Sequence, residues 1–153
     1  MRAGVSFFVP GIPKPAGSKR AFIIKGRAVI TDANNNARDW KIDVQHAAKA
    51  ASDQMEGNLF SGPIKVIMMF LLPRPKGHYR TGKNAHLLRD DAPMHPMSKP
   101  DVLKLARGTE DALTGMLWHD DAQITNEHIF KRYCMPGLDS GPGCQVEIRE
   151  DVV

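Results

Sequence analysis

Five carboxylates lie within 26 residues in the segment KPDVLKLARGTEDALTGMLWHDDAQI, which runs from Lys99 to Ile124. Two of them, Asp120 and Asp121, are adjacent and follow Trp118. Adjacent carboxylates repel each other unless a positive group neutralises them. Mg²⁺ prefers oxygen ligands, and with a phosphate substrate it polarises the phosphoryl oxygen and activates water. The cluster therefore favours metal-assisted phosphodiester hydrolysis, and the alternative is a solvated edge or turn.

A helix must position these acids. An apolar stripe runs from Val102 to Leu113, and Gly115 ends the predicted helix. Arg107 and Glu110 lie on another face of it, together with Leu103. Arg107 could offset negative charge that builds on a phosphate.

The acids at each end of this helix could also have purely structural roles. Ser98 to Asp101 spells S-x-x-D, a capping-box pattern that gives Asp101 a purely structural explanation. After the helix, residues 116–118 are expected to begin a return strand, with Asp120 and Asp121 within it or at a bulge. Asp101 and Asp121 can meet only through the three-dimensional fold.

Charge is unevenly distributed along the chain. The net charge is +4, but residues 1–32 carry six Lys and Arg against one acid, and residues 74–99 carry six against two. Residues 100–153 carry five against ten. Two basic segments and one acidic segment suit a polyanion and a cation respectively. Solvated surface charge explains the composition equally well.

The segment from about 74 to 98 is a long loop with little predicted structure. It carries five cations interleaved with Tyr79, glycines and three histidines. Loops of this length are usually functional or disordered. Basic and aromatic side chains together are typical of contacts with nucleic-acid phosphates. The competing reading is a solvated insertion.

The rest of the chain predicts a single α+β domain over residues 1–153, with a small mixed β-sheet and two main helices. Strands are expected at 5–9 and 64–72, with a hairpin around Lys25-Gly26 and a terminal hairpin pairing 124–135 with 144–150. Asp32 offers a cap for an amphipathic helix over 33–55.

The composition indicates which broad class of protein this is. The 153 residues, 42% hydrophobic and 25% charged, suit one globular domain. No apolar run approaches the roughly 20 residues of a transmembrane helix, and the N-terminus does not read as a signal peptide, so we expect a cytoplasmic protein with no membrane partner. Cys134 and Cys144 are expected to be free thiols, although they could pair across the terminal hairpin.

The run from Lys99 to Ile124 resembles the RusA family of Holliday-junction resolvases. The family pattern is Pro-Asp-x-Asp-Asn, then Lys, then Asp-Ala-Leu, then Trp followed by Asp-Asp-x-Gln. Here PDVLKLAR, DALTG, LWHDDAQI and the later KRY stand in those places, and VPGIPKPAGSKR is similar to the family's opening strand and basic turn.

The resemblance implies a symmetric homodimer that cleaves four-way junctions and other branched DNA in recombination and repair, often encoded by phages or prophages. It implies Mg²⁺ as cofactor, with Mn²⁺ able to substitute. By position it implies Asp101, Asp121 and Arg107 as catalytic residues, Arg107 replacing a family Lys that differs in shape and can lose its proton. The implied metal ligands are Asp101, Asp120 and Asp121. The basic residues expected to contact DNA are Lys14, Lys19, Arg20, Arg74, Lys76, Arg80, Lys83, Lys99 and Lys104.

One position departs from the family pattern. Leu103 stands where the family has a second catalytic Asp, and Leu cannot ligate a metal. Another acid, Asp120, Asp111 or Glu110, completes the site, or the metal is bound weakly, or the protein binds junctions without cutting them efficiently. We favour Asp120, because Glu110 lies roughly 10 Å along the helix from Leu103. A metal-dependent nuclease with another substrate is a further alternative.

Overall fold

The computed structural model describes residues 4–16, 19–32 and 35–153, with the side chains of 19–22, 29–32 and 35–37 outside the description. Its main element is a four-stranded sheet in the order β1-β6-β4-β5, formed by Val5–Pro10, Gly143–Glu150, Ile64–Leu72 and Ile124–Tyr133. β5 runs parallel to β4, whereas β6 is antiparallel to both β1 and β4. The predicted α+β domain with a mixed sheet is confirmed.

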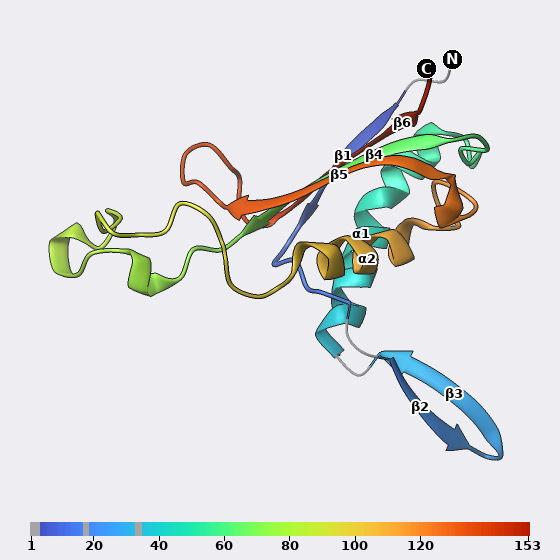
Figure 1. The fold of residues 1–153 in the computed structure, drawn as a ribbon, viewed down its shortest axis with the longest axis horizontal. Coiled ribbons are helices and arrows are strands. Elements are labelled where there is room, and N and C mark those ends of the chain that lie inside the picture. The colour runs from blue at the N-terminus through green and yellow to red at the C-terminus, as the bar shows by residue number, and fades with distance from the viewer. Residues whose placement is uncertain (1–3, 17–18, 33–34) are drawn as a thin grey trace.

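Two helices, α1 (Asn35–Gln54) and α2 (Val102–Leu113), cover one side of the sheet (Figure 1). Both follow from apolar residues repeated at steps of three and four, which gather on one helical face. In α2 the buried residues are Leu105, Ala106, Thr109, Ala112 and Leu113. The helices are joined by a buried hydrogen bond of 3.1 Å from Trp40 Nε1 to Thr109 Oγ1. This contact fixes α2 in place against the core.

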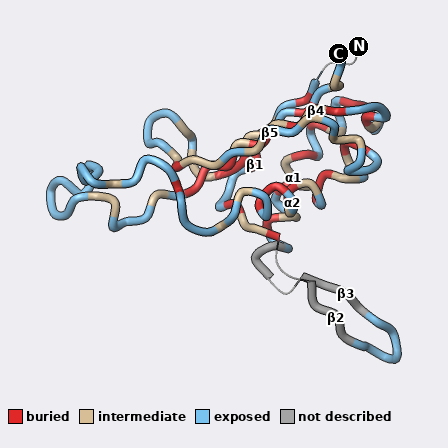
Figure 2. Tube along the Cα trace, in the orientation of Figure 1, coloured by how far each residue is buried: buried red, intermediate tan, exposed pale blue. Residues whose placement is uncertain are grey.

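The core lies between the sheet and the helices (Figure 2). Alternate residues of β4 point into it, including Val66, Met68 and Phe70, all fully buried. Trp118 and Leu117, which follow α2, are also fully buried. The adjacent acids Asp120 and Asp121 therefore follow closely after two residues that are fixed in the core.

A separate two-stranded hairpin, β2 (Lys19–Ile24) and β3 (Arg27–Asp32), projects away from the domain (Figure 1). Lys25 and Gly26 both have positive φ, which is typical of the two-residue turns that connect such hairpins. The predicted hairpin is confirmed, while the proposed cap by the Asp32 side chain and the first two residues of the predicted 33–55 helix lie outside the described residues.

The predicted terminal hairpin is wrong. β5 and β6 are both strands, but β4 lies between them and pairs with each. Cys144, Val146 and Ile148 of β6 are buried, and a central place in the sheet satisfies the backbone on both sides of this apolar strand. Cys134 and Cys144 are free thiols, as expected.

The predicted return strand at 116–118 is also wrong. Residues 114–118 form a tight turn, with Gly115 N bonded to Trp118 O at 2.7 Å and isolated bridges at Trp118. Asp121 begins a short 3₁₀ helix, η3 (Asp121–Gln123), which leads directly into β5. The adjacent acids therefore lie at the start of a helical turn that precedes the edge strand.

Residues 73–100 form an extended arm beyond the sheet (Figure 1). It contains two short 3₁₀ helices, η1 (Lys76–His78) and η2 (Gly82–Asn84), and one bridge between Tyr79 and Leu88. Residues 79–91 are almost all exposed (Figure 2). Among the described residues, no helix is long and apolar enough to cross a membrane.

Candidate active site on helix α2 and strand β5

Asp121 is held by side chains from the turn that follows α2. Its Oδ1 atom accepts a hydrogen bond from Trp118 Nε1 at 3.0 Å and a short one from Thr114 Oγ1. Trp118 is fully buried, so its indole is a fixed donor. Asp121 itself is exposed, and its position is therefore set by the core while its carboxylate faces solvent.

Asp120 has a different local role. Its Oδ1 accepts from Ala122 N at 2.8 Å, and the Gln123 side chain accepts from Asp120 N at 2.9 Å, a complete capping box at the start of η3. Gln123 also donates to Phe60 O and Gly62 O, both at 2.9 Å. The paired acids thus differ: Asp120 shapes the turn, and Asp121 is presented by it.

Glu110, in the last turn of α2, is hydrogen-bonded to Glu127 of β5. Burial above all, with the bond to Glu127 and the negative charges of Glu127, Asp121 and Asp111, raises the pKa of Glu110 to about 9. Glu110 therefore keeps its proton at neutral pH. The structure therefore brings Glu110, Glu127 and Asp121 into one acidic region.

Leu103 and Arg107 lie on the same face of α2 as Glu110. A hollow of about 290 Å³ is lined by these three residues with Lys104, Ala106 and Glu127. Arg107 is exposed there, and Leu103 is 70% exposed. The predicted shared face of Leu103, Arg107 and Glu110 is thus confirmed.

Asp101 is the N-cap residue of α2, but its side chain makes no capping hydrogen bond. The capping box predicted from Ser98 to Asp101 is therefore wrong, because the helix begins after Asp101 rather than after Ser98. The carboxylate is 64% exposed and lies 3.8 Å from Lys104 Nζ. Asp101 is available for chemistry without a competing role as a cap.

The structure does not gather the expected ligand set into one group. Among residues 4–16, 19–32 and 35–153, no three His, Cys, Asp or Glu side chains are placed so that they could hold a metal ion. Asp101 is nine residues before Glu110 in the chain, about 13 Å along the helix. Asp121 lies instead with Glu110 and Glu127.

Sequence reasoning missed Glu127 and Lys131, both on β5. Lys131 Nζ donates to Ser98 O at 2.8 Å and to Pro100 O at 2.9 Å, which holds the segment before α2 against the edge strand. Glu127 could have been suspected as an acid on the strand that follows the acidic segment. Its contact with Glu110 of α2 depends on the order of the strands in the sheet, and no local sequence pattern predicts that order.

Of the expected DNA-contacting residues, Lys14, Lys99 and Lys104 line one pocket with Asp101. In the arm, Lys76 and Lys83 are exposed, whereas Arg80 is paired with Asp90 at 2.9 Å. Arg74 donates to Pro93 O at 2.6 Å, and its guanidinium lies 4.3 Å from the centre of the Tyr133 ring. Lys19 and Arg20 belong to β2, and their side chains lie outside the described residues.

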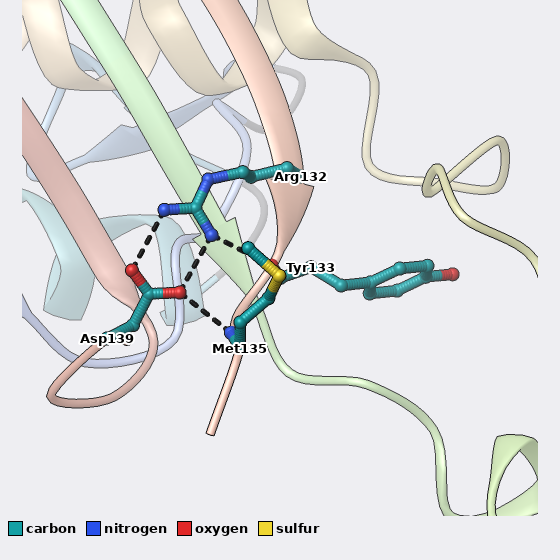
Figure 3. Close-up of polar contacts among 4 residues, drawn as sticks. All are labelled: Arg132, Tyr133, Met135 and Asp139. Atoms are coloured by element: carbon teal, nitrogen blue, oxygen red, sulfur yellow. Dashed lines mark hydrogen bonds and ion pairs between the residues drawn. The ribbon is translucent and has the colours of Figure 1, made fainter. Parts of the chain in front are cut away.

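A second polar cluster stabilises the loop between β5 and β6 (Figure 3). Arg132 and Asp139 form a bidentate pair, with Nη1 to Oδ2 at 2.7 Å and Nη2 to Oδ1 at 2.8 Å, and Met135 N donates to Asp139. Tyr133 points away from this pair (Figure 3). The pair therefore lies on the opposite side of the strand from the Tyr133 ring.

Comparison with known proteins agrees with the resemblance in the acidic segment. The chain is similar to the uncharacterized protein YqaN of Bacillus subtilis (strain 168), with 27% identity over 146 residues that cover 95% of this chain and 96% of that protein. Residues 10–149 match the family described as Endodeoxyribonuclease RusA. Members of this family are Holliday-junction resolvases that depend on a divalent metal. Because the match covers nearly the whole sequence, the chain belongs to the RusA endodeoxyribonuclease family.

Proposed function

We propose that this protein cuts four-way junctions and other branched DNA at the surface formed by α2, η3 and β5, in recombination and repair. The observation that carries the proposal is the cluster of Glu110, Glu127 and Asp121 beside Arg107. In a chain of a nuclease family, acids next to a cation suit a phosphodiester substrate.

The side chains at this surface are of the chemical type that binds a divalent cation. Glu110, Glu127 and Asp121 offer carboxylate oxygens, which Mg²⁺ and Mn²⁺ prefer, and their mutual repulsion is the condition that a bound cation relieves. Because no three acids of the described residues are placed to bind an ion together, we propose that Asp121 and Glu127 would hold it, with substrate phosphate and water as the other ligands. Glu127 would stand in for the acid missing at Leu103, and Glu110 would be its hydrogen-bond partner. When bound, the cation would activate water and stabilise charge on the phosphate.

Asp121 would serve this site through its fixed orientation. Trp118 and Thr114 both donate to the same oxygen, Oδ1, which prevents the carboxylate from rotating freely. Asp120, also expected as a ligand, is proposed to act beside it while capping η3. Asp101 is proposed to act from the other end of α2, near the lysines that approach the DNA.

Arg107 would contact the scissile phosphate. It lies in the same hollow as Glu110 and Glu127, within reach of a phosphate held there. A guanidinium stays charged at all physiological pH values and can bond two phosphate oxygens at once. It would stabilise the extra negative charge of the transition state.

The departure at Leu103 keeps a second reading open. A protein that binds junctions but cuts them weakly would have the same fold and the same basic surface, with a poorer metal site. A third reading is a nuclease that acts on ordinary duplex DNA or on RNA from the same scaffold.

One experiment separates these readings. Labelled four-way junction and matched linear duplex are incubated with the protein in Mg²⁺, Mn²⁺ or EDTA. Symmetric nicks on the junction alone, absent in EDTA, support the proposal. Band shifts without nicks support the binding protein, and equal cutting of both substrates supports the general nuclease.

A further inference from the structure

A pocket of about 420 Å³ lies beside Asp101 and is separate from the Glu110 hollow. Its volume falls in the range of roughly 300–1,000 Å³ that is usual for small-molecule sites. Three segments far apart in the sequence form its walls, residues 12–15, 72–75 and 96–104, and Tyr133 of β5 closes it. The pocket is therefore a product of the fold that no single motif predicts.

The walls are apolar and rigid. Six of the lining residues are prolines, two from each segment, and a proline ring fixes its own backbone angle. The first segment is anchored on α2, because Ala16 N donates to Lys104 O at 3.0 Å. Gly108 permits this approach, since an added Cβ would lie 3.2 Å from Ala16 N. Tyr133 is held by Arg74 and by a T-shaped contact with the His78 ring.

The charged residues of the pocket are mostly cationic. Lys14, Lys99 and Lys104 line it together with the single acid Asp101. Lys104 also lines the hollow that contains Arg107, Glu110 and Glu127. A strand whose phosphates follow α2 would pass both sites, with the apolar pocket open to one of its bases.

We propose that this pocket takes one nucleotide of the bound DNA, unstacked from its neighbours, with its base against the prolines and Tyr133 and its phosphates on the lysines. A flat base suits apolar and aromatic walls, and stacking of this kind tolerates any base. Extrusion is least costly where a base is already poorly stacked, as at a branch point. The pocket would thus favour branched over linear DNA. This inference rests on the proposed function.

The test uses junctions with 2-aminopurine placed in turn at each position next to the branch. In EDTA, wild-type protein is expected to raise the fluorescence at one position, because the probe leaves the stack. Ile12→Trp fills the pocket without changing charge, and Ile12 is 49% exposed, so the substitution is tolerable for folding. It is expected to abolish the rise and to slow junction cleavage about ten-fold or more, the scale of one stacked base. The matched control is Ile42→Trp on α1, where Ile42 is 57% exposed.

A second variant and a second readout keep the proposal open to refutation. Lys99→Gln is expected to weaken the binding of deoxynucleoside 5′-monophosphates at least about three-fold, because one charge-assisted contact to the phosphate is lost. Calorimetry without junction DNA measures this binding. No fluorescence change at any position, with normal junction cleavage by wild type, overturns the pocket and leaves the proposed function intact. A change in molecular mass on Ile12→Trp would assign the pocket to a second copy of the chain and also overturn it. Failure to cut any junction, with nucleotide binding intact, overturns the proposed function alone.

Discussion

The carboxyl groups of Glu110 and Glu127 share a hydrogen bond between α2 and β5. Burial is the main reason that the pKa of Glu110 rises from 4.5 to about 9, and this bond adds to it. The unfolded chain releases the same proton near pH 4.5. The folded protein therefore binds more protons between pH 4.5 and 9, and its stability falls as pH rises through that window.

Glu110→Gln should remove this dependence. In EDTA, we expect the melting temperature of the wild type to fall between pH 5 and pH 8, and that of Glu110→Gln to fall less and to be higher at pH 8. Added Mg²⁺ should raise the melting temperature of the wild type more than that of the variant, because a cation relieves the same repulsion. Glu147→Gln, at an exposed position of β6, is the control. Equal pH dependence in all three proteins would contradict the raised pKa.

Asp121→Asn should abolish cleavage and leave junction binding intact or tighter. The amide keeps an oxygen that can accept from Trp118 and Thr114, so the turn is preserved while one negative charge is lost. Cleavage and band-shift assays on the same protein measure the two effects. Asp53→Asn, which breaks only an exposed pair with Lys49, is the control. Full activity in Asp121→Asn would remove Asp121 from the proposed site.

Asp101→Asn should also reduce cleavage, with no loss of a capping bond. The sequence alone predicts a cost of about 1 kcal/mol for a lost cap. The structure has no such bond, so thermal melts of this variant and of the wild type should agree closely. A clear loss of stability would restore the capping role.

The arm should contribute to DNA affinity through Lys76 and Lys83. Each phosphate contact that is lost lowers the slope of log affinity against log salt by nearly one unit. Lys76→Ala with Lys83→Ala is therefore expected to lower it by up to about two. Arg80→Ala should lower it less, because Asp90 already pairs with Arg80. Lys49→Ala serves as the control, and an unchanged slope in the double variant would make the arm lysines ordinary surface.

The β5–β6 loop should depend on the Arg132–Asp139 pair. The bond to Arg132 lowers the pKa of Asp139 from 3.8 to about 2, so the pair stabilises the fold fully above pH 3.8 and is lost as pH falls through 2. The Asp139 side chain is only 8% exposed, and that of Arg132 is 26% exposed. Removing one partner of a buried pair costs 3–5 kcal/mol, and for this partly exposed pair we expect roughly 2 kcal/mol from Asp139→Asn. Denaturant unfolding at pH 7 measures it, with Asp90→Asn as an exposed control.

Local periodicity predicted the two helices well. The stripes of α1 and α2 follow from burial of one helical face, and the five buried positions of α2 all belong to the predicted stripe, whereas Val102 at its start is half-buried. The order of the strands was not predictable in this way. β6 lies between β1 and β4 because of contacts across more than seventy residues of sequence, and periodicity carries no information about such partners.

The same limit applies to the site. Asp121, Glu110 and Arg107 could be selected from the acidic segment and the helical face. Glu127 belongs to the site only because η3 is followed directly by β5, the strand that runs alongside α2. The capping box assigned to Ser98–Asp101 failed for a related reason: Lys131, from a distant strand, binds the carbonyls of Ser98 and Pro100. The true box lies at Asp120 and Gln123.

The last prediction is that the protein works as a homodimer. A four-way junction has near two-fold symmetry, and its resolution requires matched cuts in two strands. A two-fold dimer presents two copies of one site related by the same operation. The edge strand β5 carries Phe130, which is 45% exposed, and Leu138 beyond it is 69% exposed. These exposed apolar side chains offer a surface for the second copy.

Light scattering on the free protein should give twice the chain mass of 16.9 kDa, about 34 kDa. Phe130→Lys should shift it toward the monomer, because a charge on each copy would face the other across the two-fold axis. Ile42→Lys on α1 is the matched control and should leave the mass unchanged. In the junction assay, the monomeric variant should nick single strands without pairing the cuts, since only one site is present on each DNA. A monomer mass for the wild type at micromolar concentration, with unpaired nicks, would refute the dimer.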